Sequence, residues 1–260
     1  MRTLIKLGGT LLDSADSRSR LAEEIAAFSA KSGNETVVVH GGGKQMTRFL
    51  AERGIESRFL NGLRVTTPEV IDAVLKVFAG TVNHELVASL VAAGAKAVGL
   101  SGIDSALVEA EPLGGEYGAV GMPVRTNPEV LHVLCGAGFL PVVACIAGDR
   151  AGNVYNVNAD QMAAACAVGF GAERLFFLTD VAGVRDASGQ TASTLTSSQI
   201  DDLIRHGTAT GGMQAKLEAA RMALRDGVRQ IVIAPGSRTG IVRELANNEE
   251  RGTKIADYVG

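Results

Sequence analysis

The sequence has few cysteines and no excess of basic residues, and both shortages narrow the classes of protein it can belong to. Its three cysteines, Cys135, Cys145 and Cys166, are an odd number, lie in apolar stretches and form no C-x-x-C motif. This usage predicts reduced core residues rather than disulfides. The 25 Lys and Arg against 28 Asp and Glu give a net charge of -3, without any five-residue basic run, which disfavours a nucleic-acid partner.

The sequence also lacks the signals of export and of membrane insertion. Its N-terminus has no charged segment followed by an apolar one, and no window is expected to approach the ~20 apolar residues that cross a bilayer. These absences predict a cytoplasmic protein with no membrane partner. Hydrophobic residues make up 46% of the 260 residues and charged residues 20%, as in a folded chain that forms one large domain or two lobes sharing a sheet.

Several catalytic motifs are absent as well. Neither G-x-x-x-x-G-K-[ST] nor a G-x-G-x-x-G following a strand occurs, which excludes a P-loop and removes the main support for a dinucleotide fold. There is no G-x-S-x-G, no H-E-x-x-H and no Cys/His cluster, so no residue is predicted to bind a metal. The four histidines are scattered and are expected to cap or pack. Only His40 stands out, because it adjoins three glycines.

What is present is a regular alternation of short β-branched runs and longer amphipathic stretches. It predicts a mainly parallel sheet with helices on both faces. The expected strands are 3–7, 36–40, 97–100, 140–144, 175–179 and 230–233. The expected helices are 17–32, 44–53, 68–93, 128–137, 159–168, 197–206, 213–226 and 240–247. Two hairpins are expected, one joining 106–111 to 117–125 and one within 148–157. A soft division falls near residue 170.

Two predicted strands end in consecutive glycines. The first runs into Lys6-Leu7-Gly8-Gly9 and the second into His40-Gly41-Gly42-Gly43. Glycine permits tight turns and removes the Cβ that would keep an anion away from backbone N–H groups. A helix that follows adds the positive end of its dipole. Two such loops in tandem, the first preceded by a lysine, predict a site that binds phosphate.

Further residues suit phosphoryl transfer, in which cations and N–H donors stabilise charge spread over the moving group. Lys6 ends the first strand, and Lys216 follows Gly211-Gly212 near the start of a helix. Asp160 follows the alternating polar segment 156–158, and Asp180 follows another strand. Taken singly, each lysine fits a solvated surface position and Asp160 fits a simple helix N-cap.

In order and spacing, these motifs resemble the amino-acid kinase family over essentially the whole chain. Among its members the resemblance is greatest to those that phosphorylate N-acetyl-L-glutamate in arginine biosynthesis. The motifs that carry it are Lys6-Leu7-Gly8-Gly9, His40-Gly41-Gly42-Gly43, Asn61-Gly62-Leu63-Arg64-Val65-Thr66, Asn156-Val157-Asn158-Ala159-Asp160, Leu178-Thr179-Asp180-Val181-Ala182-Gly183-Val184 and Gly211-Gly212-Met213 with Lys216.

The resemblance implies a three-layer αβα sandwich forming one continuous domain. Residues 1–170 would form an N-terminal lobe for dimerisation and for N-acetyl-L-glutamate, and residues 171–260 a C-terminal lobe for ATP with Mg²⁺. Lys6, Lys216 and Asp160 would be catalytic, with Asp160 holding both lysines. The residues implied to bind substrate are Gly42, Gly43, Arg64 and Asn156. Those implied to bind the nucleotide are Gly8, Gly9, Asp180, Val181, Gly183, Thr210, Gly211 and Gly212.

Four positions, in three segments, depart from the usual pattern of the family. Lys44 follows the triple glycine where proline is common, Gln214-Ala215 stands where isoleucine and proline are frequent, and Ile103 replaces a lysine. Two alternatives stay open: a kinase of another amino-acid carboxylate, such as carrier-linked aminoadipate, or a non-catalytic sensor. Apolar residues along 68–93 predict a homodimer, or else a helix buried in its own subunit. The short segment before the first strand further leads us to expect insensitivity to arginine.

Overall fold

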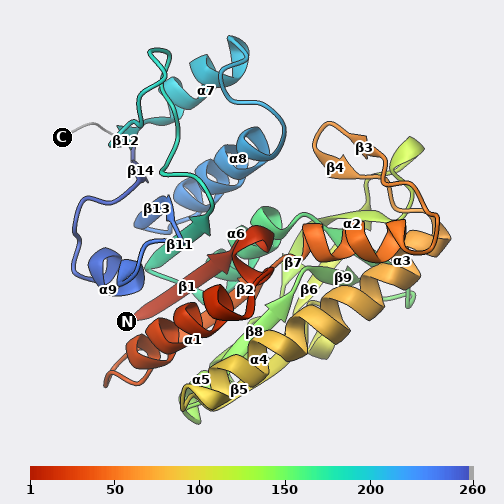
Figure 1. Cartoon of the computed structure of the whole chain (residues 1–260), viewed down its shortest axis with the longest axis horizontal. Helices are drawn as coiled ribbons and strands as arrows, with labels where there is room; N and C mark the ends of the chain where they lie inside the picture. The colour runs from red at the N-terminus through yellow and green to blue at the C-terminus, as the bar shows by residue number, and fades with distance from the viewer. Residues whose placement is uncertain (258–260) are drawn as a thin grey trace.

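A computed structural model of the chain describes residues 1–257. Its main sheet has eight strands in the order β12-β14-β13-β11-β1-β2-β8-β5 (Figure 1). These strands are β12 (Thr194–Leu195), β14 (Thr253–Ile255), β13 (Gln230–Pro235), β11 (Arg174–Thr179), β1 (Arg2–Leu7), β2 (Glu35–His40), β8 (Leu140–Ala144) and β5 (Ala97–Ser101). All pairs except β13 with β14 are parallel, so the mainly parallel sheet is confirmed.

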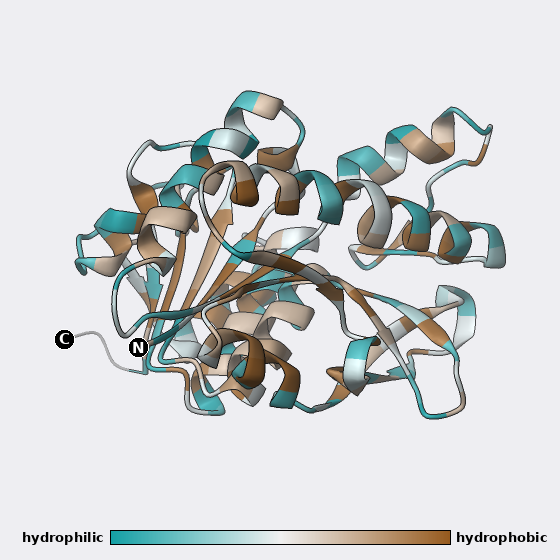
Figure 2. Cartoon of the chain, turned by 90° about the horizontal axis from the view of Figure 1, so that it is seen from below, coloured by the Kyte–Doolittle hydropathy of each residue, from teal (hydrophilic) through white to brown (hydrophobic). Residues whose placement is uncertain are grey.

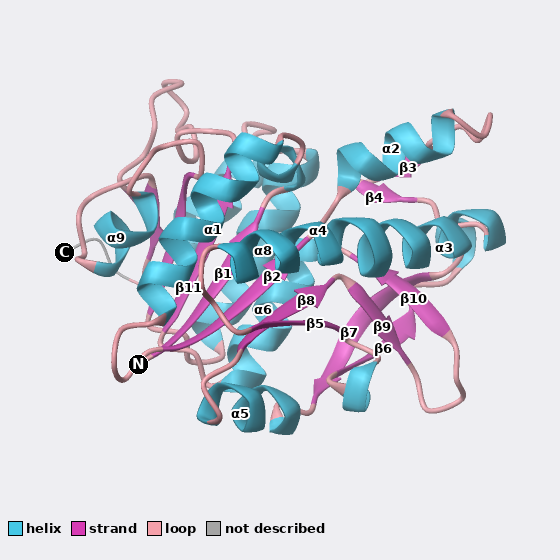
Figure 3. Ribbon diagram, turned by 60° about the horizontal axis from the view of Figure 1, so that its bottom comes forward, coloured by secondary structure: helices cyan, strands magenta, loops and turns pink. Residues whose placement is uncertain are grey.

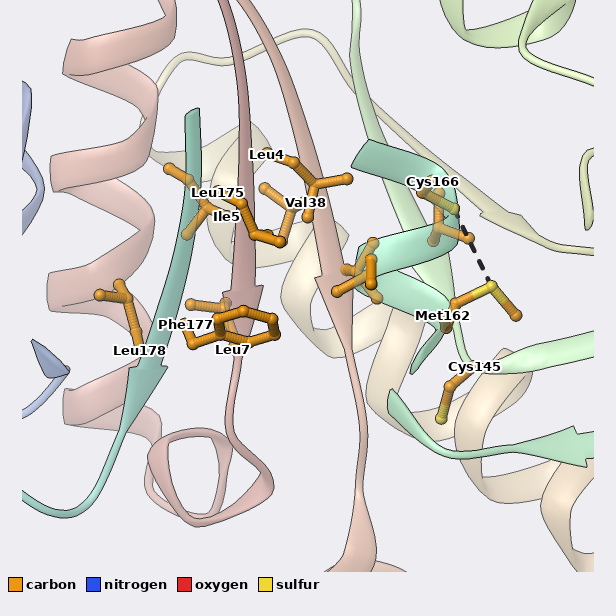
Figure 4. Packing of buried hydrophobic residues seen from close by; sticks show 14 of the residues in the cluster. Leu4, Ile5, Leu7, Val38, Cys145, Met162, Cys166, Leu175, Phe177 and Leu178 are labelled. Atoms are coloured by element: carbon orange, nitrogen blue, oxygen red, sulfur yellow. Dashed lines mark hydrogen bonds between the residues drawn. The ribbon is translucent and has the colours of Figure 1, made fainter. Parts of the chain in front are cut away.

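Strand β1 lies in the middle of this sheet, between β2 and β11. Lys6 pairs with Val39 on one side and with Phe177 on the other. The neighbouring Leu4 and Ile5 are fully buried, as an apolar strand covered on both faces requires. Figure 4 shows these two residues packed beside side chains of β2 and β11. The first predicted strand therefore places its lysine in the interior of the main sheet.

Helices cover both faces of the sheet, which makes the three-layer αβα sandwich that was expected (Figure 3). Helices α1, α4 and α9 contact one another or the strands on one side, and α5, α6 and α8 do so on the other. In Figure 2 the interior strands are largely hydrophobic, while hydrophilic residues lie on the outer surfaces of the helices. The helices are α1 (Ala15–Ser29), α2 (Gly43–Ala51), α3 (Pro68–Val74), α4 (Asn83–Ala92), α5 (Glu129–Gly136), α6 (Ala159–Phe170), α7 (Ser197–Arg205), α8 (Gly211–Arg225) and α9 (Ile241–Ala246).

Two smaller sheets stand beside the main one. Strands β10 (Val154–Val157), β7 (Val120–Thr126), β6 (Val108–Pro112) and β9 (Ile146–Gly148) close a small barrel. The predicted hairpins are confirmed as the antiparallel pairs of β6 with β7 and of β9 with β10. The pair β3 (Phe59–Leu60) and β4 (Leu63–Arg64) was not predicted, nor were β12 and β14, because two or three residues carry no readable alternation.

The expected helix over 68–93 is one continuous helix with an irregular middle. Residues Leu75–Val82, between α3 and α4, have π-helical hydrogen bonding. Residues Pro68–Ala92 are also long and apolar enough to cross a membrane, with a window of mean hydropathy 1.3, so the expectation that no segment approaches this was wrong. The same helix packs against α1, β5 and α2 and buries Val77, Phe78 and Leu86, which accounts for its apolar composition within this fold.

Three short 3₁₀ turns complete the described elements. They are Gly9–Leu12, which follows β1, and the two surface turns Asp104–Ala106 and Gly115–Tyr117. The first of them matters for the site, since it carries the chain from the glycines after β1 to the start of α1.

Candidate active site

Asp160 lies in the first turn of α6, directly after β10. The side chain of Asn158 caps this helix, accepting hydrogen bonds from the backbone N–H groups of Asp160 (2.9 Å) and Gln161 (3.3 Å). Asn158 therefore caps the helix, and the carboxylate of Asp160 is not needed for that role. A negative charge in the first turn is also favoured by the helix dipole.

The structure brings together the three residues predicted to be catalytic. The Nζ atoms of Lys6 and Lys216 contact the same oxygen, Asp160 Oδ1, at 2.8 Å and 2.7 Å. Each of these residues is only 6% exposed. Lys216 Nζ also lies 5.3 Å from the centre of the Phe177 ring. Two lysines from β1 and α8 thus converge on one acid, and the readings of each as a solvated or merely capping residue are wrong.

The electrostatics of this triad leave one positive charge unbalanced. Burial raises the pKa of the Asp160 carboxyl, but the charges of Lys216 and Lys6 outweigh it and lower this pKa to about 2. Burial is also the main reason that the pKa of Lys216 falls to about 8, although Asp160 opposes the shift. At pH 7 the acid is ionised and Lys216 is largely protonated. The triad therefore suits an anion that arrives with its own negative charge.

The two glycine loops approach each other closely beside this triad. A Cβ on Gly9 would stand 3.0 Å from the backbone nitrogen of Gly43. The N–H of Gly8 donates to the carbonyl of Leu178 at 2.8 Å, so the prediction that it donates to a phosphate is wrong in this conformation. Gly8 instead ties β1 to the end of β11, where a Cβ would stand 3.2 Å from the same carbonyl.

The three glycines after β2 have different surroundings, so a side chain would have a different effect at each. A Cβ on Gly41 would stand 3.3 Å from the Cβ of Ala159, and one on Gly42 would stand 3.0 Å from Phe78. A Cβ on Gly43 would meet nothing within 4 Å. Gly43 begins α2, whose first-turn N–H groups have no acceptor within the helix. Gly41 and Gly42 therefore allow the loop to pack closely against its neighbours, whereas the backbone of Gly43 is accessible at the N-terminus of α2.

A buried histidine and a buried asparagine form hydrogen bonds that connect this loop to the core. His40 is fully buried, with Nδ1 2.8 Å from the carbonyl of Gly41 and Nε2 2.9 Å from Nδ2 of Asn83. Asn83 Nδ2 also donates to the carbonyl of Val142 at 3.0 Å. Burial lowers the pKa of His40 to about 4, so the ring is neutral at pH 7. His40 was noted only for its position, and nothing in the sequence pointed to Asn83, which follows the π-helical turns.

Arg64, predicted to bind a carboxylate, lies at the end of β4 and is 8% exposed. Its guanidinium donates to the carbonyl of Gly43 at 3.1 Å, to the hydroxyl of Thr47 at 2.8 Å and to the hydroxyl of Ser57. It also lies 4.6 Å from the centre of the Phe59 ring. Within residues 1–257 all the hydrogen-bond partners of this guanidinium are neutral oxygens. Burial lowers the pKa of Arg64 from its ordinary value.

Asn156 joins the same region from β10. Its Nδ2 donates to the hydroxyl of Thr66 at 3.0 Å, and that hydroxyl donates to the carbonyl of Arg64 at 2.8 Å. The tip of the β3–β4 hairpin reaches the other half of the chain, since a Cβ on Gly62 would stand 3.1 Å from the carbonyl carbon of Gly211. The structure therefore places the predicted substrate-binding residues on neighbouring segments.

The residues predicted to bind the nucleotide lie after β11 and at the start of α8. Asp180 and Val181 are exposed, while Gly183 is packed, since a Cβ there would stand 2.7 Å from Thr191 and Thr253. Thr210 precedes α8 without capping it through its side chain, and its carbonyl accepts from Met213 N at 3.1 Å. Gly211 has a φ of +53°, and a Cβ on it or on Gly212 would meet open space. These two glycines offer backbone to a ligand.

Among residues 1–257, no three His, Cys, Asp or Glu side chains are grouped to hold a metal ion. Asp160, the acid at the centre, is already engaged by both lysines. The three cysteines are free thiols in the core; Figure 4 shows the contact of Cys166 with Met162.

Comparison with known proteins gives a consistent result. A model described as the amino acid kinase family matches residues 1–235. An acetylglutamate kinase from Solibacter usitatus is 63% identical, covering 98% of this chain and 99% of its own. One from Koribacter versatilis is 41% identical, covering 94% of each chain. The solved structure of N-acetylglutamate synthase from Neisseria gonorrhoeae, complexed with coenzyme A and N-acetyl-glutamate, gives a TM-score of 0.87 at 27% identity. It covers 100% of this chain and 60% of that one.

Proposed function

The chain belongs to the amino acid kinase family, and from this premise we propose that it transfers the γ-phosphoryl group of ATP to the side-chain carboxylate of N-acetyl-L-glutamate, in arginine biosynthesis. The products are ADP and an acyl phosphate. The observation that carries the proposal is the pair of buried lysine Nζ atoms held on Asp160 Oδ1. The name of the relatives that are 63% and 41% identical supports the choice of substrate.

The chemistry needs no general base. A carboxylate is ionised at neutral pH and is itself the nucleophile. One of its oxygens forms the new bond to phosphorus while the bond from phosphorus to the ADP oxygen breaks, and the leaving oxygen keeps the electron pair. Negative charge grows on the transferring group and on the leaving group, where Lys6 and Lys216 would stabilise it. Asp160 would act as a positioning residue that keeps both cations at the reacting centre.

We assign the acceptor substrate to the half of the chain that carries Arg64 and Asn156. The guanidinium of Arg64 would receive a carboxylate in a two-pronged geometry, and Asn156 would hydrogen-bond the substrate. The backbone of Gly42 and Gly43 would donate to its oxygens at the N-terminus of α2. The neutral partners of Arg64 support this assignment, because a carboxylate can replace them without displacing an acid.

We assign ATP to the other half of the chain, at the carboxyl end of β11 and the N-terminus of α8. Asp180, Val181 and Gly183 would border the nucleotide, and Thr210, Gly211 and Gly212 would offer backbone to its phosphates. Gly8 and Gly9 would line the path between the two substrates. We expect Mg²⁺ to arrive bound to the ATP phosphates, since no acid cluster within residues 1–257 is suited to hold it.

We further propose a soluble, cytoplasmic homodimer with two lobes, 1–170 and 171–260, that share the main sheet. The exposed side chains of Leu75 (39%) and Val91 (53%) lie on the long helix from Pro68 to Ala92. The adjacent β5 is an edge strand. Exposed apolar residues beside an open sheet edge are a suitable surface for a second copy of the chain. Light scattering in solution tests the dimer directly.

The experiment that tests the reaction is ADP release with a panel of acceptors. N-acetyl-L-glutamate should be the best acceptor, ahead of glutamate, aspartate, aminoadipate, carbamate and UMP. A preference for aminoadipate over N-acetyl-L-glutamate would support the alternative of a kinase for another amino-acid carboxylate. Binding of N-acetyl-L-glutamate without ADP release would support the sensor instead, and the Lys6–Asp160–Lys216 contacts would then need another explanation.

A further inference from the structure

Thr66 is a fully buried residue between β4 and α3, and each of its polar groups is hydrogen-bonded. Its N–H donates to the carbonyl of Tyr117 at 2.9 Å, and its carbonyl accepts from the N–H of Ala119 at 2.7 Å. Its hydroxyl donates to the carbonyl of Arg64 at 2.8 Å and accepts from Nδ2 of Asn156 at 3.0 Å. Thr66 therefore connects three segments that are far apart in sequence.

The backbone bonds of Thr66 attach the β3–β4 hairpin to the small barrel. Thr66 and Gly118 form a parallel bridge just before β7. Gly118 has a φ of +64°, and a Cβ on it would overlap the carbonyl oxygen of Thr66, so only glycine fits there. The carbonyl of Ala119 accepts from the N–H of Asn156 at 2.9 Å, and β10 then continues parallel to β7. The end of the hairpin and the strand that carries Asn156 thus share one neighbour.

The hydroxyl of Thr66 has a fixed direction because its two partners differ in what they can do. The carbonyl of Arg64 can only accept, so the hydroxyl hydrogen points to it. The hydroxyl oxygen can then only accept from Asn156, which places the amide nitrogen of Asn156 against Thr66. The amide oxygen of Asn156 is consequently turned away from Thr66. The threonine hydroxyl thus sets the orientation of this amide.

We infer that Thr66 is a positioning residue for the acceptor substrate, an inference that rests on the proposed function. Arg64 and Asn156 come from different elements, β4 and β10, and the hydroxyl of Thr66 is hydrogen-bonded to both residues. It holds the backbone of Arg64 and the amide of Asn156 at one spacing. Groups that are held in place beforehand do not have to be ordered when the ligand binds. Loss of the hydroxyl therefore weakens binding of the acceptor and not of the nucleotide.

Substitutions that remove or keep the hydroxyl test this role. Thr66→Val keeps the shape of the side chain but removes both hydroxyl bonds, and KM for N-acetyl-L-glutamate should rise about tenfold. KM for ATP, and kcat at saturating acceptor, should change by less than about twofold. Thr66→Ser keeps the hydroxyl and should hold KM for N-acetyl-L-glutamate within about twofold of the wild type. If Thr66→Val does not fold, Thr66→Cys replaces it, and its weaker hydrogen bonds should still raise this KM.

Thr253→Val is the matched control. Thr253 is also fully buried, and its hydroxyl likewise makes two hydrogen bonds. It accepts from the N–H of Val184 at 2.8 Å and donates to the carbonyl of Ala192 at 2.6 Å. It lies on β14, in the other half of the chain. Thr253→Val should lower the melting temperature, as Thr66→Val does, but should leave KM for N-acetyl-L-glutamate unchanged.

A double substitution shows whether Thr66 acts through Asn156. In an Asn156→Ala background, Thr66→Val should raise KM for N-acetyl-L-glutamate less than in the wild-type background, because the amide is already absent. Four results would overturn the inference: an unchanged KM in Thr66→Val, an equal rise in KM for ATP, an equal rise in Thr253→Val, or a rise that Thr66→Ser shares. If the wild-type chain released no ADP with N-acetyl-L-glutamate, the proposed function would fail, and this inference with it.

Discussion

The two ends of the candidate active site hold their charged groups in opposite ways. At the phosphoryl end, Lys6 and Lys216 are fixed by a buried acid, Asp160. At the end proposed to bind the acceptor, the partners of Arg64 in the described part of the chain are neutral oxygens, among them Thr47 Oγ1 at 2.8 Å. Under the proposed function, the two fixed lysines would stabilise charge that appears during the reaction, whereas Arg64 would exchange its neutral partners for a substrate carboxylate. Substitutions at the two ends should therefore change different kinetic constants.

The largest effect should follow from removing either lysine at the phosphoryl end. Lys6→Ala and Lys216→Ala should each lower kcat by about 10²-fold or more, with smaller changes in KM, because their charges act on the transition state. Steady-state kinetics of ADP release measures both constants. Lys31→Ala, at an exposed lysine far from the triad, is the matched control. An unchanged kcat in either variant would remove that lysine from the mechanism.

A smaller and differently placed effect is expected at the acceptor end. Arg64→Lys keeps the positive charge but loses the planar two-pronged donor, so KM for N-acetyl-L-glutamate should rise about tenfold. KM for ATP should change little. If KM for ATP rose instead, Arg64 would belong to the nucleotide end, and the comparison between the two ends would fail.

Substitution of Asn83 gives a further comparison of the two ends, because Asn83 contacts His40, which in turn contacts the glycine loop after β2. Asn83→Ala removes the donor to His40 Nε2 and should loosen the loop of Gly41, Gly42 and Gly43. We expect KM for N-acetyl-L-glutamate to rise several-fold at nearly constant KM for ATP. Asn34→Ala, which deletes a hydrogen bond to the carbonyl of Phe28 just before the start of β2, is the control for simple loss of stability. Equal changes in KM for N-acetyl-L-glutamate and KM for ATP would show that Asn83 has only a general structural role.

The smallest effect near neutral pH should come from the titration of Lys216. Burial lowers its pKa to about 8 in the free protein, so its charge is present below that pH and lost above it. The value of kcat/KM for ATP should fall to about half its maximum near pH 8 and continue to fall at higher pH. Lys216→Arg, if active, should shift this decline upward. A flat profile to pH 9.5 would show that Lys216 keeps its proton.

The sequence predicted the long strands and helices of the fold better than the short strands and the buried hydrogen bonds near the site. Long apolar strands and amphipathic helices were readable, since their periodicity extends over many residues. Lys6, Asp160 and Lys216 were singled out from motifs, although nothing local showed that they share one oxygen atom. Asn83 was missed because its role depends on contacts with His40 and Val142 that lie far apart in sequence. The short strands β3, β4, β12 and β14 depend likewise on tertiary pairing.

The free N–H group assumed for Gly8 was a different kind of error. Glycine after a strand was taken to present its N–H group to phosphate, yet this one continues the bonding between β1 and β11. Gly9 and Gly42 are glycine because other parts of the chain approach them closely. Sequence alone does not distinguish a glycine whose N–H group binds a ligand from one that is needed because another part of the chain packs closely against it.

The most direct test of the proposed reaction is to trap its product. Purified protein, MgATP and N-acetyl-L-glutamate should form an acyl phosphate, which hydroxylamine converts to a stable hydroxamate in proportion to the ADP released. The hydroxamate should fall at least about 10²-fold in Lys216→Ala. ADP release without hydroxamate, or hydroxamate formation that is undiminished in Lys216→Ala, would contradict phosphoryl transfer to the carboxylate by the buried lysines.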